Sequence, residues 1–213
     1  PDASLYFQKF VIILSIVGVI YGSIIAIQQE DIKKMIAYSS IAHMGFVTAA
    51  IFSLNQNGFT AGVFQMVSHG LVSGGLFLCI GVLYQRLHTR EFSKFGGLAK
   101  KMPNFAIVLM VLTMASAGLP ATSGFVGEFM TIVAVYQNSI YYSILISLSV
   151  IFGALYMLYM YKKTMFGSIT NPEVASIKDL NITENVSLFS IVAFVLILGI
   201  YPNLLIQLIP TIF

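Results

Sequence analysis

Charged residues are scarce in this chain. Asp, Glu, Lys and Arg make up 9% of its 213 residues, whereas hydrophobic residues make up 58%. Soluble domains carry about 25% charged residues, so this composition excludes an ordinary soluble domain. The formal charge of +3 does not indicate nucleic-acid binding, because the basic residues cluster in short connections between long apolar runs. We expect an all-α polytopic membrane protein in contact with lipid.

Cysteine is almost absent as well. Cys79 is the only one, which excludes an internal disulfide, a four-cysteine iron–sulfur cluster and a cysteine-based zinc site. The histidines lie on different segments without metal-ligand spacing, and the sequence has no Gly-Lys-Ser/Thr phosphate loop and no nucleophile elbow. We therefore expect no metal and no resident cofactor on this chain.

Long apolar runs predict six membrane helices. They cover residues 5–27, 32–54, 59–84, 105–136, 139–161 and 186–209. The connections on one side hold ten of the eleven Lys and Arg residues, and Lys9 is the exception. By the positive-inside rule, that side faces the bacterial cytoplasm or the mitochondrial matrix, and both ends of the chain face outward.

One acidic residue, Glu128, lies deep in an apolar stretch. A carboxylate at that depth costs roughly 3 kcal/mol on insertion scales, and such residues usually face a protein interior or a water-filled path. The stretch 105–136 is longer than an ordinary span and contains Gly118, Pro120 and Gly124, which predicts a broken helix. Broken helices at membrane depth commonly mark transport sites; the alternative is a proline kink packed against its neighbours.

Two histidines are candidate partners of Glu128 in proton transfer, because histidine changes protonation near physiological pH. Gln65, His69 and Ser73 recur at every fourth position and form one polar stripe on the third expected helix. His43 lies on the second expected helix. We predict a proton path through both histidines; the alternative for each is a hydrogen-bonded packing residue.

The second expected helix begins with three charged residues. Asp31 is placed to cap the helix by accepting a backbone hydrogen bond. Lys33 and Lys34 are either topology anchors that reach the headgroups or groups that admit protons from the inner side.

Three segments closely resemble the antiporter-like membrane subunits of proton-pumping NADH:quinone oxidoreductase, respiratory complex I. They are residues 31–40 together with 42–46, residues 68–71, and residues 118–120 leading to 124–129. In the sister L-type and N-type subunits a lysine stands at the position of Glu128, so the glutamate resembles the M-type, called subunit 4 in mitochondria.

The resemblance implies an antiporter-like fold in three parts. Residues 1–161 correspond to the second inverted repeat, with its broken helix at 105–136, followed by an inner loop at 162–185 and a terminal membrane helix at 186–213. Pro1 opens the sequence without a methionine or a leader pattern. We therefore expect a fragment or processed product whose N-terminal half lies on the same or on a separate polypeptide.

The resemblance also implies proton translocation by a subunit of an energy-coupling enzyme complex. Glu128 matches the family's mid-membrane carboxylate, and His69 and His43 match its histidine motifs. NADH, FMN, iron–sulfur clusters and quinone are expected on other subunits, and neighbouring antiporter-like subunits are the expected partners. The membrane is then the mitochondrial inner membrane or the bacterial plasma membrane.

Two other functions are compatible with the sequence. One is a subunit of a cation/proton antiporter or of a membrane-bound hydrogenase, which share this fold; sodium dependence or the co-purifying subunits would identify them. The other is a structural bundle in which Glu128 is merely paired, and in which a neutral substitution would leave transport intact.

Overall fold

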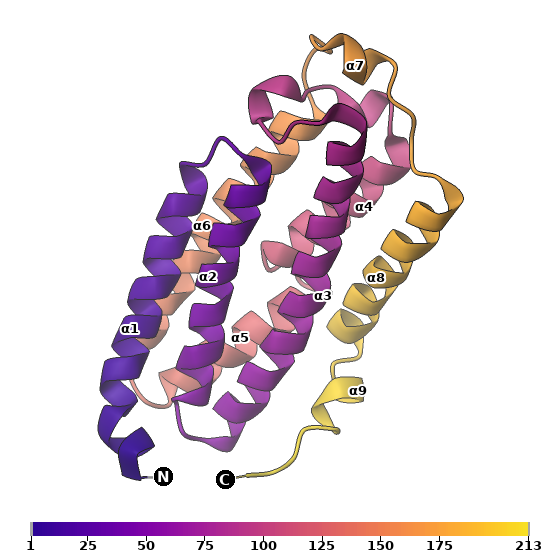
Figure 1. The fold of residues 1–213 in the computed structure, drawn as a ribbon. Helices are drawn as coiled ribbons and strands as arrows, with labels where there is room; N and C mark the ends of the chain where they lie inside the picture. The colour runs from indigo at the N-terminus through magenta and orange to yellow at the C-terminus, as the bar shows by residue number, and fades with distance from the viewer. Residues whose placement is uncertain (1, 213) are drawn as a thin grey trace.

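Residues 2–212, which the computed structural model describes, form a bundle of long helices without named strands (Figure 1). The long helices are α1 (Asp2–Ile27), α2 (Ile32–Ile51), α3 (Gln56–Leu87), α4 (Pro103–Ser116), α5 (Ser123–Tyr136), α6 (Ile140–Met165) and α8 (Ile182–Ile200). The short elements are η1 (Phe92–Lys94), η2 (Leu98–Lys100), α7 (Pro172–Ala175) and α9 (Asn203–Ile206).

Four of these helices, α1, α3, α6 and α8, are long and apolar enough to cross a membrane. The helix α2 carries Lys33 and Lys34 in its first turn, and α4 and α5 are apolar but have only 14 residues each. The six-span topology therefore stays a prediction.

The helix α2 begins as the sequence predicts. The Asp31 side chain accepts a hydrogen bond from the backbone N–H of Lys34 at 3.0 Å. The Arg90 side chain lies 3.6 Å from the Asp31 carboxylate, and the Ile32 N–H donates to the Arg90 carbonyl at 3.0 Å. These contacts fix the connection after α3 to the start of α2.

The last long helix differs from its expected range, residues 186–209. It begins at Ile182 with a capping box between Asn181 and Glu184, and it ends at Ile200. The reason is Pro202, which has no N–H and disfavours helical geometry in the preceding Tyr201. The chain continues as the separate short helix α9.

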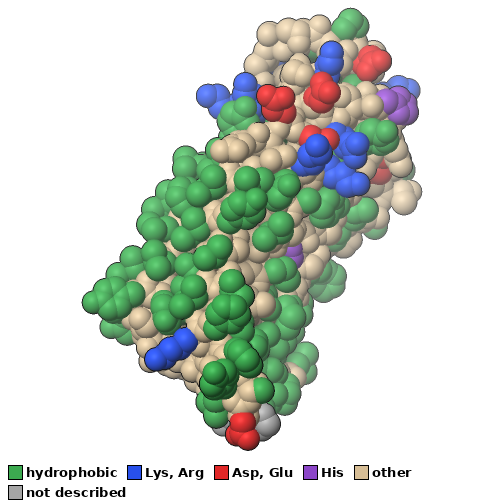
Figure 2. All heavy atoms as spheres, turned by 60° about the vertical axis from the view of Figure 1, so that its left-hand side comes forward, with side chains coloured by type: hydrophobic (Ala, Val, Ile, Leu, Met, Phe, Trp, Pro, Cys, Tyr) green, Lys and Arg blue, Asp and Glu red, His purple; other side chains and the backbone are tan. Residues whose placement is uncertain are grey.

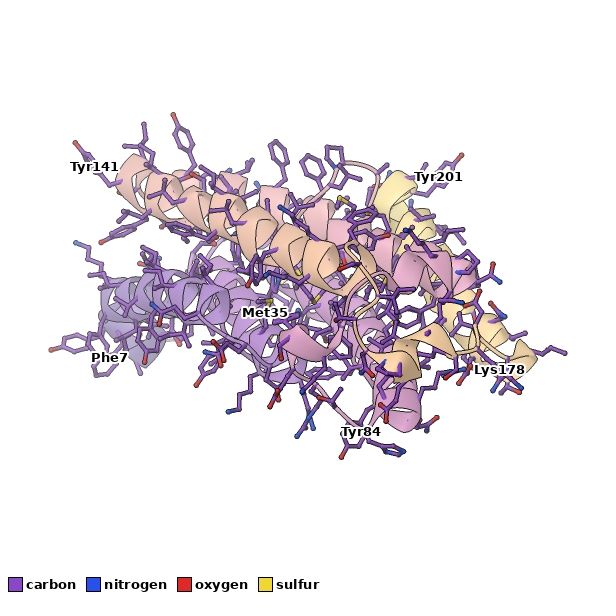
Figure 3. The ribbon with its side chains drawn as sticks, turned by 90° about the horizontal axis from the view of Figure 1, so that it is seen from above. Phe7, Met35, Tyr84, Tyr141, Lys178 and Tyr201 are labelled. Carbon is purple, nitrogen blue, oxygen red and sulfur yellow. The ribbon has the colours of Figure 1, made fainter. Side chains whose placement is uncertain are left out.

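The main hydrophobic core lies between α2, α3, α4, α6 and α8. Met35 lies inside the bundle, whereas Phe7, Tyr141 and Tyr201 point away from it (Figure 3). Large apolar side chains stay exposed along α1, α6 and α8, as expected for helices that face lipid. Charged side chains gather at one end (Figure 2), and the start of α1 and the segment after α9 lie at the other (Figure 1).

The helices α1 and α2 pack closely together at Gly45. A Cβ atom on Gly45 would lie 2.8 Å from the backbone oxygen of Ser15 and 2.5 Å from a methyl group of Val19. The Ser15 oxygen is part of a helix and cannot rotate away. By contrast, a Cβ on Gly70 would meet nothing within 4 Å.

We predict that Gly45→Ala lowers the free energy of unfolding by about 1–3 kcal/mol, because the added methyl group overpacks the α1–α2 contact. The matched control is Gly70→Ala, which should leave stability unchanged or raise it, since alanine favours a helix. The measurement is thermal unfolding in detergent, followed by the reaction of a thiol dye with the buried Cys79. Equal losses in both variants would contradict the close approach.

Candidate functional site

Glu128 lies on α5 in the interior of the bundle and is 5% exposed. Its Oε1 atom is 3.2 Å from Nδ1 of His43 on α2. The distance is that of an ion pair, but the contact lacks hydrogen-bond geometry, and Nδ1 has no hydrogen-bond partner among the described residues. Proton transfer between the two atoms therefore requires a rotation that aligns the N–H group with the carboxylate oxygen.

The helix α4 ends in a tight turn that leads into the connection to α5. After Ser116, the N–H of Leu119 donates to the carbonyl of Met114 at 2.9 Å, and the N–H of Gly118 donates to the carbonyl of Ala115 at 3.3 Å. Gly118 has φ +75°. These two bonds with a left-handed glycine form a Schellman motif, the common way to end a helix. The exposed Pro120 then prevents the helix from resuming at once.

Gly118 also leaves room for the carboxylate. A Cβ atom on Gly118 would lie 2.7 Å from Oε2 of Glu128. The positive φ and the absence of a side chain are therefore both required where the end of α4 meets Glu128. Gly124 has a related role, since a side chain there would overlap the carbonyl oxygen of Ala115.

His43 faces polar groups with both of its ring nitrogens. Nδ1 faces Glu128, and Nε2 lies 3.3 Å from the hydroxyl oxygen of Ser116 at the end of α4. An imidazole can accept a proton on one nitrogen and release another from the second. The ring is thus placed to connect the carboxylate to the hydroxyl.

His69, on α3, is the titratable group next to His43. Its ring centroid is 5.1 Å from that of His43, with the ring planes tilted by 37°. Gln65 is 2% exposed, and its side-chain oxygen has no hydrogen-bond partner among the described residues. It packs so closely on Gly127 that a side chain there would overlap it.

Two small cavities adjoin Glu128 and His43, each of about 10 Å³, which is room for about one water molecule. The first is lined by the stripe Gln65, His69 and Ser73 that the sequence predicts, together with Gly124 and other residues. The structure therefore brings the stripe, the two histidines and Glu128 together.

The second cavity involves residues that sequence reasoning missed. It is lined by Ser23 on α1 and by Ser149 and Tyr156 on α6. Both α1 and α6 carry several other hydroxyl side chains, so the sequence does not single out these three. Ser116 was missed for the same reason, although its place directly before the break was a usable signal.

Lys33 and Lys34 do not line either cavity. Both are exposed in the first turn of α2, at the charged end of the bundle. Any transfer of protons between these lysines and His43 would need groups other than their own side chains.

The chain resembles known membrane proteins over nearly all of its length. The family described as NADH:quinone oxidoreductase/Mrp antiporter, TM, matches residues 2–153. NADH-quinone oxidoreductase subunit M of Rickettsia prowazekii is 46% identical over 203 residues, covering 95% of this chain and 41% of the relative. NADH-ubiquinone oxidoreductase chain 4 of Marchantia polymorpha is 41% identical over 207 residues, covering 97% and 42%.

The same likeness holds in three dimensions. A chain in the structure of respiratory complex I from Thermus thermophilus with bound NADH superposes with a TM-score of 0.91 at 32% identity, covering 98% of this chain and 44% of that one. This chain thus spans about two-fifths of the length of its relatives. Since the family matches residues 2–153 of the 213, the chain belongs to the NADH:quinone oxidoreductase/Mrp antiporter family of transmembrane proteins.

Proposed function

We propose that this chain is the C-terminal part of an M-type membrane subunit that translocates protons within NADH:quinone oxidoreductase. Glu128 takes up and releases the proton. The observation that carries the proposal is the contact of 3.2 Å between Glu128 and His43, buried beside the break between α4 and α5. A buried titratable pair between two helix ends is costly in a membrane, and a transport role explains its presence.

The proton path runs through the two histidines. A proton on Glu128 passes to Nδ1 of His43, and the Nε2 proton of the same ring passes toward Ser116. Water in the first cavity connects Glu128 to His69. Moving one charge across a membrane at 100 mV requires about 2.3 kcal/mol, so a modest change in the electrostatic field of a neighbouring subunit suffices to drive each step.

In the membrane, we propose that α4 and α5 are the two halves of one discontinuous span. A helix of 14 residues is about 21 Å long at about 1.5 Å per residue, too short for a hydrocarbon core of about 30 Å. The helix α2 is then a span whose lysines lie at the headgroups. This gives six spans with both ends outward, in a bacterial plasma membrane or a mitochondrial inner membrane.

Residues 1–161 form the second inverted repeat in this proposal, 162–185 the inner loop and 186–213 the terminal segment. The first repeat is supplied by the N-terminal half of the subunit, and neighbouring antiporter-like subunits are the partners. NADH, FMN, the iron–sulfur clusters and quinone are bound by other subunits, and this chain contributes the translocase part of the enzyme.

A second candidate function is cation/proton exchange, because the matching family includes Mrp antiporters. Transport that requires sodium would identify this function. Relatives above 40% identity are named as oxidoreductase subunits, which favours the first proposal. Co-purification with hydrogenase subunits would instead identify a subunit of a membrane-bound hydrogenase.

We expect Glu128→Gln to reduce coupled proton transport at least about tenfold while the complex still assembles, because glutamine keeps the size of the side chain but cannot titrate. Glu128→Asp should retain part of the activity. The measurement is proton pumping in reconstituted vesicles, normalised to assembled complex. The control is Glu173→Gln, the same change at an exposed position on α7. Normal pumping by the Glu128→Gln protein would show that Glu128 and His43 form only a structural pair.

The two histidines should differ in their effects. His43→Gln should reduce pumping about tenfold or more, because His43 contacts Glu128 directly. His69→Gln should reduce it less, since water can replace one member of a relay. His88→Gln, at the exposed end of α3, is the control. A larger loss for His69 than for His43 would contradict the order of the path.

The proposed orientation is tested by thiol labelling in sealed vesicles, in a Cys79→Ala background. Asn57→Cys lies in the first turn of α3 and Ser168→Cys in the connection after α6, and both positions are exposed. A membrane-impermeant reagent on the outer side should label position 57 and not position 168. The reverse pattern would overturn the orientation.

A further inference from the structure

The charged end of the bundle carries two adjoining pockets outside the site described above. The lysine pocket, of about 460 Å³, is lined by Lys162, Lys163, Ser93, Ser168 and Thr170 among others. The acidic pocket, of about 620 Å³, is lined by Glu30, Asp31, Glu91, Lys34 and others. Both pockets share the side chains Phe92, Ser93, Tyr159 and Lys163 as a common wall.

The lysine pocket has the chemistry of a phosphate site. Lys162 and Lys163 come from the last turn of α6, and no acidic residue lines the pocket. Lys163 is held by its position over the Tyr159 ring, with Nζ 5.5 Å from the ring centroid. Two ammonium groups together with nearby hydroxyl donors suit a phosphate group, which carries negative charge and accepts several hydrogen bonds.

The acidic pocket has the complementary chemistry. Asp31 is already engaged, since it caps α2 and lies 3.6 Å from Arg90. The carboxylates of Glu30 and Glu91 have no ion-pair partner among the described residues. These two carboxylates are free to accept hydrogen bonds from a ligand ammonium group.

The surroundings of the pockets are those of a lipid ligand. Both pockets lie where α1 and α6 end at the charged face. Ile24 and Ile27 near the end of α1, and Leu155 and Leu158 near the end of α6, are all at least 40% exposed. These side chains offer an apolar surface for acyl chains, which a soluble phosphate compound would not need.

We propose that the two pockets together bind the headgroup of a phospholipid with a primary amine, of the phosphatidylethanolamine type. The phosphate lies in the lysine pocket, and the ammonium group lies between Glu30 and Glu91 in the acidic pocket. The headgroup of phosphatidylglycerol offers a phosphate to the first pocket, but its uncharged glycerol brings no positive charge to the second. A choline headgroup has the correct charge but no N–H groups to donate.

The test measures lipid binding to the purified intact protein by native mass spectrometry. Dissociation constants are compared for phosphatidylethanolamine, phosphatidylcholine and phosphatidylglycerol with identical acyl chains. We expect the ethanolamine lipid to bind roughly tenfold more tightly than the other two, the effect of one or two charge-assisted hydrogen bonds. Tighter binding of phosphatidylglycerol, or equal binding of all three lipids, would overturn the proposal.

Two pairs of substitutions separate the pockets. Lys162→Gln with Lys163→Gln should weaken binding of the ethanolamine lipid roughly tenfold. Glu30→Gln with Glu91→Gln should remove the preference for ethanolamine over choline and keep the remaining binding. Lys100→Gln with Lys101→Gln is the matched control, because these exposed lysines line neither pocket. Unchanged binding in the first pair would contradict a phosphate site.

Two further measurements serve as controls for the fold and for binding of a soluble anion. The protein with Lys162→Arg and Lys163→Arg preserves both positive charges and should retain most of the lipid binding. Comparison with the Gln variant then shows whether binding is lost because the charges are gone or because the fold is disturbed. Inorganic phosphate at millimolar concentration should not displace the lipid, since it makes no contact with the acidic pocket or the apolar surface. Complete displacement by phosphate would assign the pocket to a soluble anion and overturn the lipid proposal.

Discussion

The burial of one carboxylate is the constraint around which the centre of this bundle is built. Glu128 is 5% exposed, and an ionisable group at that depth is unfavourable unless polar partners surround it. His43 supplies the nearest partner, and it can be placed there only because α4 stops at Ser116 and leaves the space beside Gly118 open. The end of α4 and the buried pair therefore belong to one arrangement.

The position of α5 depends on close backbone contacts. Gly124 lies against the end of α4 and Gly127 lies against Gln65 on α3, and in both places a side chain would overlap its neighbour. A hydrogen bond of 2.8 Å between the hydroxyls of Ser68 and Ser123 adds a polar link from α3 to the first turn of α5. These contacts hold Glu128 at the depth of the histidines.

The charged end of the bundle is held together differently. Arg86 on α3 forms an ion pair with Glu184 on α8 at 2.6 Å, and the Asp179 carboxylate accepts hydrogen bonds from the N–H groups of Asn104 and Phe105 at the start of α4. Polar contacts of this kind hold the ends of the helices in place, whereas apolar side chains pack the middle parts of the helices together. The helix α6 contributes to both regions, since it carries Tyr156 at the inner cavity and Lys162 in the lysine pocket.

The sequence by itself determined the helical class, most helix positions, the Asp31 cap and Glu128 as the residue that most needs an explanation. These follow from composition, hydropathy and local backbone chemistry, which depend on near neighbours in the chain. Only the tertiary structure decided that His43 is the direct partner of Glu128 and that Tyr156 lines the same site, because these contacts join helices far apart in sequence. The helices α1 and α6 each carry several hydroxyl side chains, and only the packing of the helices decides which of them reach the cavity beside Glu128.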